Sequence, residues 1–363
     1  MNWTSRKKLY EQIEMRRNRP LIIYVTSKRE GIYALMSSDA LAPIIDQLDC
    51  LPPDAKAIDF LIVSYGGDPM VAWRIMTLIR QRVEKVSVLV PQSAYSAATL
   101  LALGANEIVM HPNGHIGPVD MQITAAGESG QAKRFSTEDI SAFLEFVREN
   151  LKITDQEHIR MLFELTCKEV GSLGIGFTAR SSKLAVDLGE RLLGMHMKDD
   201  ESRTKLRTIV QNMSRKFQSH AYPVNRIEAI ELGLNVNTER DNDLEKLMWD
   251  IWLSVEDELK ERSPFDPIFE LLRSPEASKL LAPIPQMDLP VPQQMMLNSG
   301  LADIKKEAHN IVNPIDFKVV TAMVESSRAA YHNIMEGKIL ARRNPDLMIQ
   351  YNRVVSSREW QKI

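Results

Sequence analysis

The stretch Ile58–Pro69, with the sequence IDFLIVSYGGDP, decides the fold class of this chain. Its first part, Ile58–Val63, has the length and apolar composition of a buried β-strand. Gly66 and Gly67 end that strand, and Asp68-Pro69 then supplies a helix N-cap followed by proline at the first helical position. A buried strand that turns directly into a helix is typical of layered α/β domains.

The same alternation of strands and helices continues on both sides of this stretch. Strands are expected at 21–25, 58–63, 86–90, 107–110 and around Ile116. Helices are expected at 4–17, 38–48, from Pro69 onward, and at 96–103, 137–151, 154–170, 178–194, 201–217 and 226–232. The order of these elements predicts an α/β fold.

Composition changes along the chain predict four parts. They are an N-terminal helix (1–19), an α/β domain (20–262), a proline-rich arm or linker (263–316) and a small C-terminal α+β segment (317–363). Within the last part we expect a helix through Met335 and a final hairpin.

Composition also limits the classes of function. The net charge of −3 offers no basic face for nucleic acid. Cys50 and Cys167 are too few for a disulfide framework, and together with the charged, leaderless N-terminus they favour the cytoplasm. The longest uncharged stretch, 86–106, contains proline, glutamine and serines, so no integral membrane span is expected, although peripheral association with a membrane stays open.

No cofactor is indicated by any motif. His111 and His115 are separated by Pro112 and Gly114, so they cannot share a helix face as metal ligands, and we interpret both as loop residues. The sequence has no phosphate-binding loop of the Gly-x-x-x-x-Gly-Lys type. We therefore expect neither a metal site nor an ATPase activity within this chain.

Two segments have the composition of a hydrolytic site. The glycine pair after the strand can point main-chain N–H groups at an anion beside the positive end of the next helix. Ser96 opens a helix of small residues, where its hydroxyl is either a simple N-cap or a nucleophile in the same positive field. Each segment alone is most often structural.

Taken together and in this order, the two segments resemble a known family. The glycine pair, then Tyr95–Met110 (YSAATLLALGANEIVM), Ile116–Asp120 (IGPVD) and Ser219–Leu234 resemble proteases of the Clp and signal-peptide-peptidase superfamily, especially its serine dehydrogenase proteinase branch. The resemblance covers roughly residues 20–260. It implies a Clp-protease/crotonase-like spiral of ββα units with helical additions and a C-terminal extension.

The resemblance also implies roles for individual residues. Ser96 would be the nucleophile, and the N–H groups of Gly67 and Ala97 would form the oxyanion hole, with Gly66 and Tyr65 contacting substrate. The sequence departs from the family pattern at Tyr65, where proline is usual, and at Ala98, where glycine is usual.

The general base is the open question of the sequence, because no histidine stands where the Clp peptidase subunit has its base. Lys133, just ahead of the helix expected at 137–151, resembles the placement of the lysine in signal-peptide-peptidase relatives. A lysine can act as a base only if burial lowers its pKa. His220 is the alternative base. Asp120 is interpreted as a loop-holding residue.

Three functions therefore compete. The first is a serine peptidase that acts on unfolded or short peptides, assembled as a homo-oligomer through the proline-rich arm and the C-terminal segment. The second is a crotonase-type acyl-CoA enzyme, which needs carboxylates such as Glu107 or Asp120. The third is a catalytically inactive Clp-fold scaffold that lacks a base.

Overall fold

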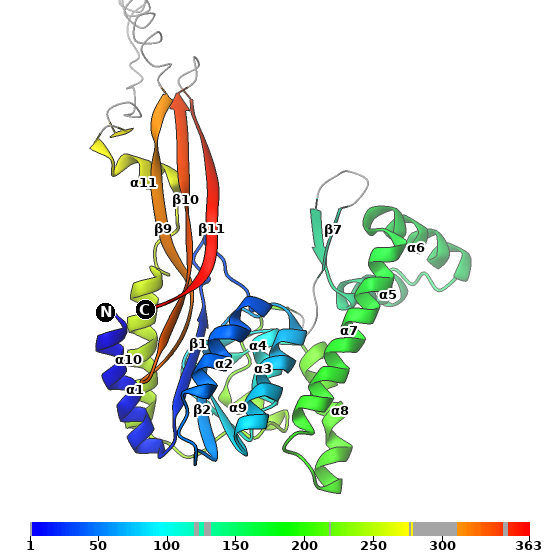
Figure 1. The fold of residues 1–363 in the computed structure, drawn as a ribbon. Helices are drawn as coiled ribbons and strands as arrows, with labels where there is room; N and C mark the ends of the chain where they lie inside the picture. The colour runs from blue at the N-terminus through cyan, green and yellow to red at the C-terminus, as the bar shows by residue number, and fades with distance from the viewer. Residues whose placement is uncertain are drawn as a thin grey trace, which may run out of the picture. The chain divides into compact units, whose positions relative to one another are not determined.

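The computed structural model describes residues 2–119, 123–126, 132–217, 219–275, 277–278, 311–343 and 348–363. The chain forms two compact units (Figure 1). Unit 1 consists of Met1–Thr26, Leu35–Ser254 and Val324–Ala329, and unit 2 of Ser27–Ala34, Val255–Met323 and Ala330–Ile363. These units cut across the four segments expected from the sequence, because residues 27–34 group with the C-terminal strands.

Parallel strands form the centre of unit 1. They pair in the order β1 (Leu21–Thr26), β2 (Ala57–Val63), β3 (Lys85–Val90) and β5 (Glu107–Met110). All of β1 is buried, as are all residues of β2 after the first. Such continuous apolar runs are expected where helices cover a parallel sheet.

Helices and two short strand pairs complete unit 1. The helices are α1 (Trp3–Arg17), the 3-10 helix η1 (Ser38–Ala40), α2 (Leu41–Asp49), α3 (Pro69–Arg82), α4 (Ala97–Leu103), α5 (Thr137–Glu149), α6 (Gln156–Val170), α7 (Ser172–Leu193), α8 (Asp200–Arg215), α9 (Arg226–Glu231) and the first part of α10 (Asn242–Leu259). β4 (Ser93–Ala94) pairs in parallel with β6 (His115–Ile116), and β7 (Ile123–Ala126) pairs antiparallel with β8 (Ala132–Phe135). The α/β class expected from the sequence is confirmed.

A buried ion pair anchors α1 within unit 1. Arg6 Nη2 lies 2.6 Å from Glu325 Oε1, and both side chains are fully buried. The hydroxyl of Tyr10 donates a hydrogen bond to the second oxygen of Glu325 at 2.5 Å. Burial, and next the charge of Glu325, raise the pKa of Tyr10 well above its usual value, so the phenol stays protonated and donates.

Unit 2 is built around long strands. Its elements are α11 (Pro267–Leu272), most of β9 (Ile311–Ser326), β10 (Ala330–Arg343) and β11 (Ile349–Lys362). β10 pairs antiparallel with β11. Ile339 and Ala341 are buried with Phe265 and Phe317 in the hydrophobic core of this unit.

The helix expected through Met335 is wrong, because that residue lies in β10. Met335, Ile339 and Ala341 are all odd-numbered and buried in one cluster, so the apolar period here is two residues rather than the 3.6 of a helix. The hairpin expected at the C-terminus is present as β10 and β11.

Smaller differences follow from local capping. The helix expected at 154–170 begins at Gln156, because the carboxylate of its N-cap Asp155 accepts a hydrogen bond from the His158 N–H. α7 begins at Ser172, so only Gly171, with φ of +78°, interrupts the chain before it. Helix α10 and the β7–β8 hairpin were not foreseen. The proline-rich arm contains α11, and residues 279–310 of that arm lie outside the described residues.

Candidate active site

A glycine bend links β2 to α3 within unit 1. The Gly66 N–H donates to the Ser64 hydroxyl oxygen at 3.1 Å, and the Thr26 hydroxyl donates to the same oxygen at 2.8 Å. Gly66 and Gly67 have φ of +93° and +150°, a region that side chains with a Cβ rarely enter. After the bend, the Asp68 carboxylate accepts from the Met70 N–H at 2.8 Å and begins α3.

Met36 holds the second half of this bend. Its N–H donates to Gly66 O at 2.7 Å, and its carbonyl accepts from the Asp68 N–H at 2.9 Å. Gly67 lies between these two bonds along the chain, so its own N–H points away from Met36. Within the described part of the chain, nothing accepts a hydrogen bond from the Gly67 N–H, so this donor is available to a ligand.

Ser96 has a strained backbone at the start of α4. Its φ of +52° and ψ of −115° lie outside the regions that residues with a Cβ normally occupy. Such a conformation costs on the order of 1–3 kcal/mol and persists only where the surroundings impose it. The surroundings of Ser96 include two hydrogen bonds that fix the residues next to it. The Tyr95 N–H donates to Ser64 O at 2.9 Å, and the Thr99 hydroxyl lies 2.7 Å from Ala94 O.

The glycine bend and Ser96 are in direct contact. A Cβ added at Gly66 would lie 2.8 Å from Ser96 Cβ and 3.0 Å from Ala97 N. The N–H of Ala97, the first residue of α4, has no hydrogen-bond acceptor among the residues that the structure describes. Two main-chain donors that have no acceptor among the described residues, the N–H groups of Gly67 and Ala97, therefore lie near the serine.

A cavity of about 350 Å³ opens at Ser96, entirely within unit 1. It is lined by Leu35, Met36, Ser37, Tyr65, Gly67, Asp68, Pro69, Ser96, Leu100, Val119 and His220. Four residues selected from the sequence, Tyr65, Gly67, Ser96 and His220, thus share one cavity. Gly66 packs behind them against Ser96.

The other candidate base is not placed at the cavity. The backbone of Lys133 lies in β8 opposite Ala125, and its side chain is outside the described residues. Asp120 also lies outside them. Of the two bases proposed from the sequence, only His220 has a described position on the wall of the Ser96 cavity.

The loop that carries His220 is tied to the strands beside the serine. Val224 and Ile116 exchange two main-chain hydrogen bonds, of 2.9 and 3.0 Å. The Ala221 N–H donates to the Ser219 hydroxyl oxygen at 3.2 Å, which closes the turn. These bonds bring a residue far along the chain to the edge of the cavity.

Tyr95 was missed in the sequence as part of the site. Its ring centre lies 5.2 Å from that of Tyr65, and its hydroxyl is 3.5 Å from Ala221 O in the His220 loop. A Cβ at Gly117 would lie 2.8 Å from Tyr95 Cε1, so only glycine leaves room for this ring. Burial, and then the nearby Tyr65, raise the pKa of Tyr95 to about 12. Its only sequence signal is its position just before Ser96.

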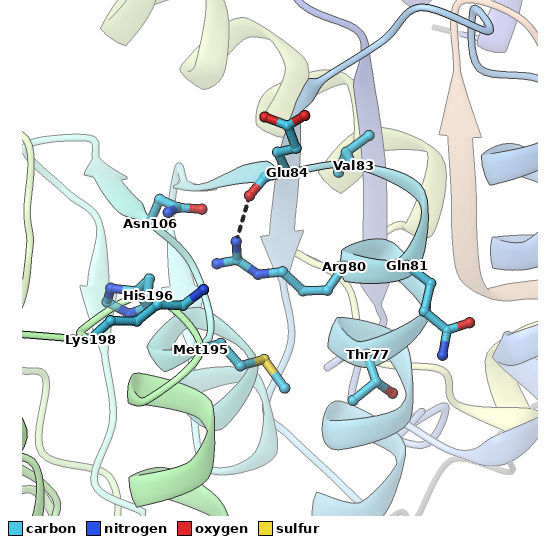
Figure 2. A pocket seen from close by; sticks show the side chains of 9 residues that line it. All are labelled: Thr77, Arg80, Gln81, Val83, Glu84, Asn106, Met195, His196 and Lys198. Carbon is cyan, nitrogen blue, oxygen red and sulfur yellow. Dashed lines mark hydrogen bonds between the residues drawn. The ribbon is translucent and has the colours of Figure 1, made fainter.

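A larger cavity of about 710 Å³ also lies in unit 1 (Figure 2). Arg80 there donates to Glu84 O at 2.9 Å and to Gly104 O at 2.7 Å, and a ring nitrogen of His196 lies 3.0 Å from Leu103 O. These side chains satisfy carbonyls at helix ends that would otherwise lack donors. We assign this cavity a structural role, because Arg80 and His196 bind carbonyls of the fold and none of its lining residues is a serine or cysteine.

The fold and site together define an α/β protein with a serine held beside two main-chain donors for which the described residues offer no acceptor. Residues 2–140 match the family model of the ClpP-like SDH-type serine proteinases. The resemblance expected from the sequence is confirmed for this part of the chain.

Two uncharacterised proteins of Methanocaldococcus jannaschii are also similar. One is 28% identical over 52% of this chain and 54% of its own length, so the similarity spans about half of that relative. The other is 24% identical over 67% of this chain and 77% of its own length.

Similar solved structures include two proteases. The 1510-N membrane-bound stomatin-specific protease has a TM-score of 0.36 and 16% identity, covering 63% of this chain and 84% of that one. ClpP1 from Listeria monocytogenes has a TM-score of 0.32 and 15% identity, covering 64% of this chain and 98% of that one. Among the described helices of the present chain, none has the length and apolar character needed to cross a bilayer.

Proposed function

We propose that this protein is a serine peptidase with Ser96 as its nucleophile. The observation that carries the proposal is the strained N-cap at Ser96, with φ of +52°, beside the N–H groups of Gly67 and Ala97, which no described residue accepts from. A strained residue at a cavity favours a functional role, because the fold must otherwise bear its cost without benefit. The match of residues 2–140 to a serine proteinase family supports the same reaction.

The proposed reaction proceeds through an acyl-enzyme. Ser96 Oγ attacks the scissile carbonyl carbon while its proton passes to the base, and the carbonyl oxygen becomes an oxyanion. The N–H groups of Gly67 and Ala97 stabilise that oxyanion, and one such donor contributes on the order of a hundredfold in turnover. The C–N bond then breaks, and the leaving amine takes the proton from the base. Water next attacks the ester carbonyl while the base accepts its proton. The ester C–O bond then breaks, and the base returns the proton to Ser96 Oγ.

We propose His220 as the base, because its side chain lines the same cavity as Ser96. Histidine is the side chain that most often acts as a general base, and it can accept the proton of a serine hydroxyl within hydrogen-bond reach. Lys133 stays the alternative, as the resemblance to Ser-Lys relatives suggests.

The cavity itself favours an apolar substrate side chain. Leu35, Met36, Leu100 and Val119 supply an apolar part of its wall, and about 350 Å³ accommodates one large side chain. An extended, unfolded peptide presents such side chains to a narrow site, whereas a folded protein does not. We therefore propose unfolded or short peptides as the substrate class.

A fluorophosphonate probe tests the proposal directly. The wild-type protein should be labelled at Ser96, and Ser96→Ala should not be labelled, whereas Ser37→Ala, which removes another serine of the same cavity, should be labelled normally. Labelling that survives Ser96→Ala rejects the nucleophile. Labelling rates of His220→Gln and Lys133→Gln identify the base, since loss of the general base typically lowers the rate by about 10²–10⁴.

The acyl-CoA alternative is less well supported by the geometry. The Glu107 carboxylate accepts hydrogen bonds from Arg17 at 2.6 Å, Ser87 at 2.7 Å and Asn237 at 2.7 Å. Burial alone would raise the pKa of Glu107, but these bonds lower it overall. Glu107 does not line the Ser96 cavity, so it is not available there as a proton carrier. An inactive scaffold would fail both labelling and peptidase assays.

A further inference from the structure

Strand β11 is the end strand of its sheet, and among described strands only β10 pairs with it. Residues 350–356 are all exposed, on both faces of the strand. Tyr351, Val354 and Val355 are exposed by 48%, 45% and 45%. A long edge strand with apolar side chains and unpaired main-chain groups is a ready template for another strand.

The pairing with β10 identifies which side chains share a face. Arg353 lies opposite Ile339 and Tyr351 opposite Ala341, and both of these β10 residues are buried in the core of unit 2. Tyr351 and Arg353 therefore lie on the core side of the strand. Arg353 is held there, because its guanidinium donates to Gly31 O at 2.7 Å and its Cζ lies 5.7 Å from the Phe265 ring centre.

A second copy of β11 can add to this edge only in certain registers. A two-fold axis perpendicular to the sheet can relate the two copies. Each residue then lies opposite a residue of the other copy whose side chain is on the same face of the sheet. The axis must therefore pass between the two copies of one residue, which lie opposite each other. The bulge at Glu336/Gly337 shifts the register beyond Val355, which confines a regular pairing to residues 349–355. Centring on Arg353 would place like charges opposite each other, which is destabilising.

Centring on Asn352 avoids that conflict and uses only described residues. It places Ile349 opposite Val355 and Gln350 opposite Val354. It also places Tyr351 opposite the arginine at position 353, a cation beside an aromatic ring. The two Asn352 side chains then face each other, and each amide carries both a donor and an acceptor.

We propose that β11 pairs antiparallel with the β11 of a second copy of this chain, with the two-fold axis at Asn352. The pairing satisfies the edge's main-chain groups and covers Tyr351, Val354 and Val355 in one step. Because it involves one short strand segment from each copy, it is at the low end of interface sizes, and the dimer is concentration-dependent.

A cysteine at the axis tests this register. In a background with Cys50→Ser and Cys167→Ser, Asn352→Cys places two thiols opposite each other, within the Cα separation of roughly 4.4–6.8 Å that a disulfide needs. The matched control, Val354→Cys, is equally exposed, but the two thiols stand about four residues apart along the ladder, about 13 Å. Mild oxidation followed by non-reducing electrophoresis should give a covalent dimer with Asn352→Cys and none with Val354→Cys.

A second measurement keeps the proposal independent of the cysteine chemistry. Val355→Lys adds an exposed charge opposite Ile349 and should shift the dimer seen by light scattering to monomer at the same concentration. Equal crosslinking at both positions, or a protein that stays monomeric throughout, overturns the proposal. Binding of an unrelated extended peptide to this edge, with no self-crosslinking, overturns it as well. Ser96 labelling does not enter either readout.

Discussion

Replacing Gly66 by alanine tests whether the glycine bend holds the serine and its oxyanion donors in place. The added Cβ would lie 2.7 Å from Tyr95 O, 2.8 Å from Ser96 Cβ and 3.0 Å from Ala97 N. Carbon atoms make favourable contact at about 3.5–4.0 Å, so the bend and Ser96 must separate by roughly 0.7 Å. The φ of +93° adds backbone strain of about 1–2 kcal/mol.

The expected result is a large loss of reactivity in a protein that still folds. A displacement approaching 1 Å at the reacting groups typically lowers a rate about a hundredfold, or about 2.7 kcal/mol in activation free energy. The assay is the second-order rate constant for fluorophosphonate labelling of Ser96, measured with circular dichroism and thermal unfolding to establish the folded fraction.

Gly171→Ala is the matched control for this experiment. Gly171 also has a positive φ, of +78°, but apart from its chain neighbours no atom of the described residues lies within 4 Å of an added Cβ. It should therefore lose only the stability that the backbone strain costs and keep its labelling rate. Normal labelling of folded Gly66→Ala would refute the proposed contact between the bend and the serine, and an equal loss in Gly171→Ala would attribute the effect to general destabilisation.

Three further predictions concern stability, each measured by denaturant or thermal unfolding. Thr99→Val should lower the free energy of unfolding by about 1–3 kcal/mol, because the buried Thr99 hydroxyl, which lies 2.7 Å from Ala94 O and 2.9 Å from Gly117 O, is lost as a donor to these carbonyls. Thr99→Ser should largely restore the stability. The pKa of Tyr95 rises from 10.0 to about 12 on folding, so its contribution to stability is complete below pH 10 and is lost as the pH rises through 12. Tyr95→Phe should remove this pH dependence of the free energy of unfolding. An unchanged pH profile in that variant would contradict the assignment. Glu325→Gln should cost about 3–5 kcal/mol because it leaves Arg6 charged, buried and without its counter-charge, and adding Arg6→Met should recover part of that loss.

Much of unit 1 could be predicted from local sequence. The apolar run of β2, the glycine pair and the Asp68-Pro69 cap each act within a few residues, and the structure has β2, the bend and α3 where those signals place them. The C-terminal segment was harder to predict. Met335, Ile339 and Ala341 are spaced by even numbers of residues, as in a strand, but the four-residue step from 335 to 339 also fits a helix. Only their burial in one cluster with Phe265 and Phe317 distinguishes the strand from the helix.

The amino-acid sequence by itself determined that Ser96 begins a helix of small residues and that two glycines follow a buried strand. Only the tertiary structure decided that these two places touch, that Met36 turns the Gly67 N–H outward, and that His220 reaches the same cavity. The physical reason is the distance along the chain over which each kind of interaction acts. Caps, turns and apolar periods depend on neighbours a few residues away, whereas a free donor and a shared cavity depend on what segments distant along the chain leave unfilled.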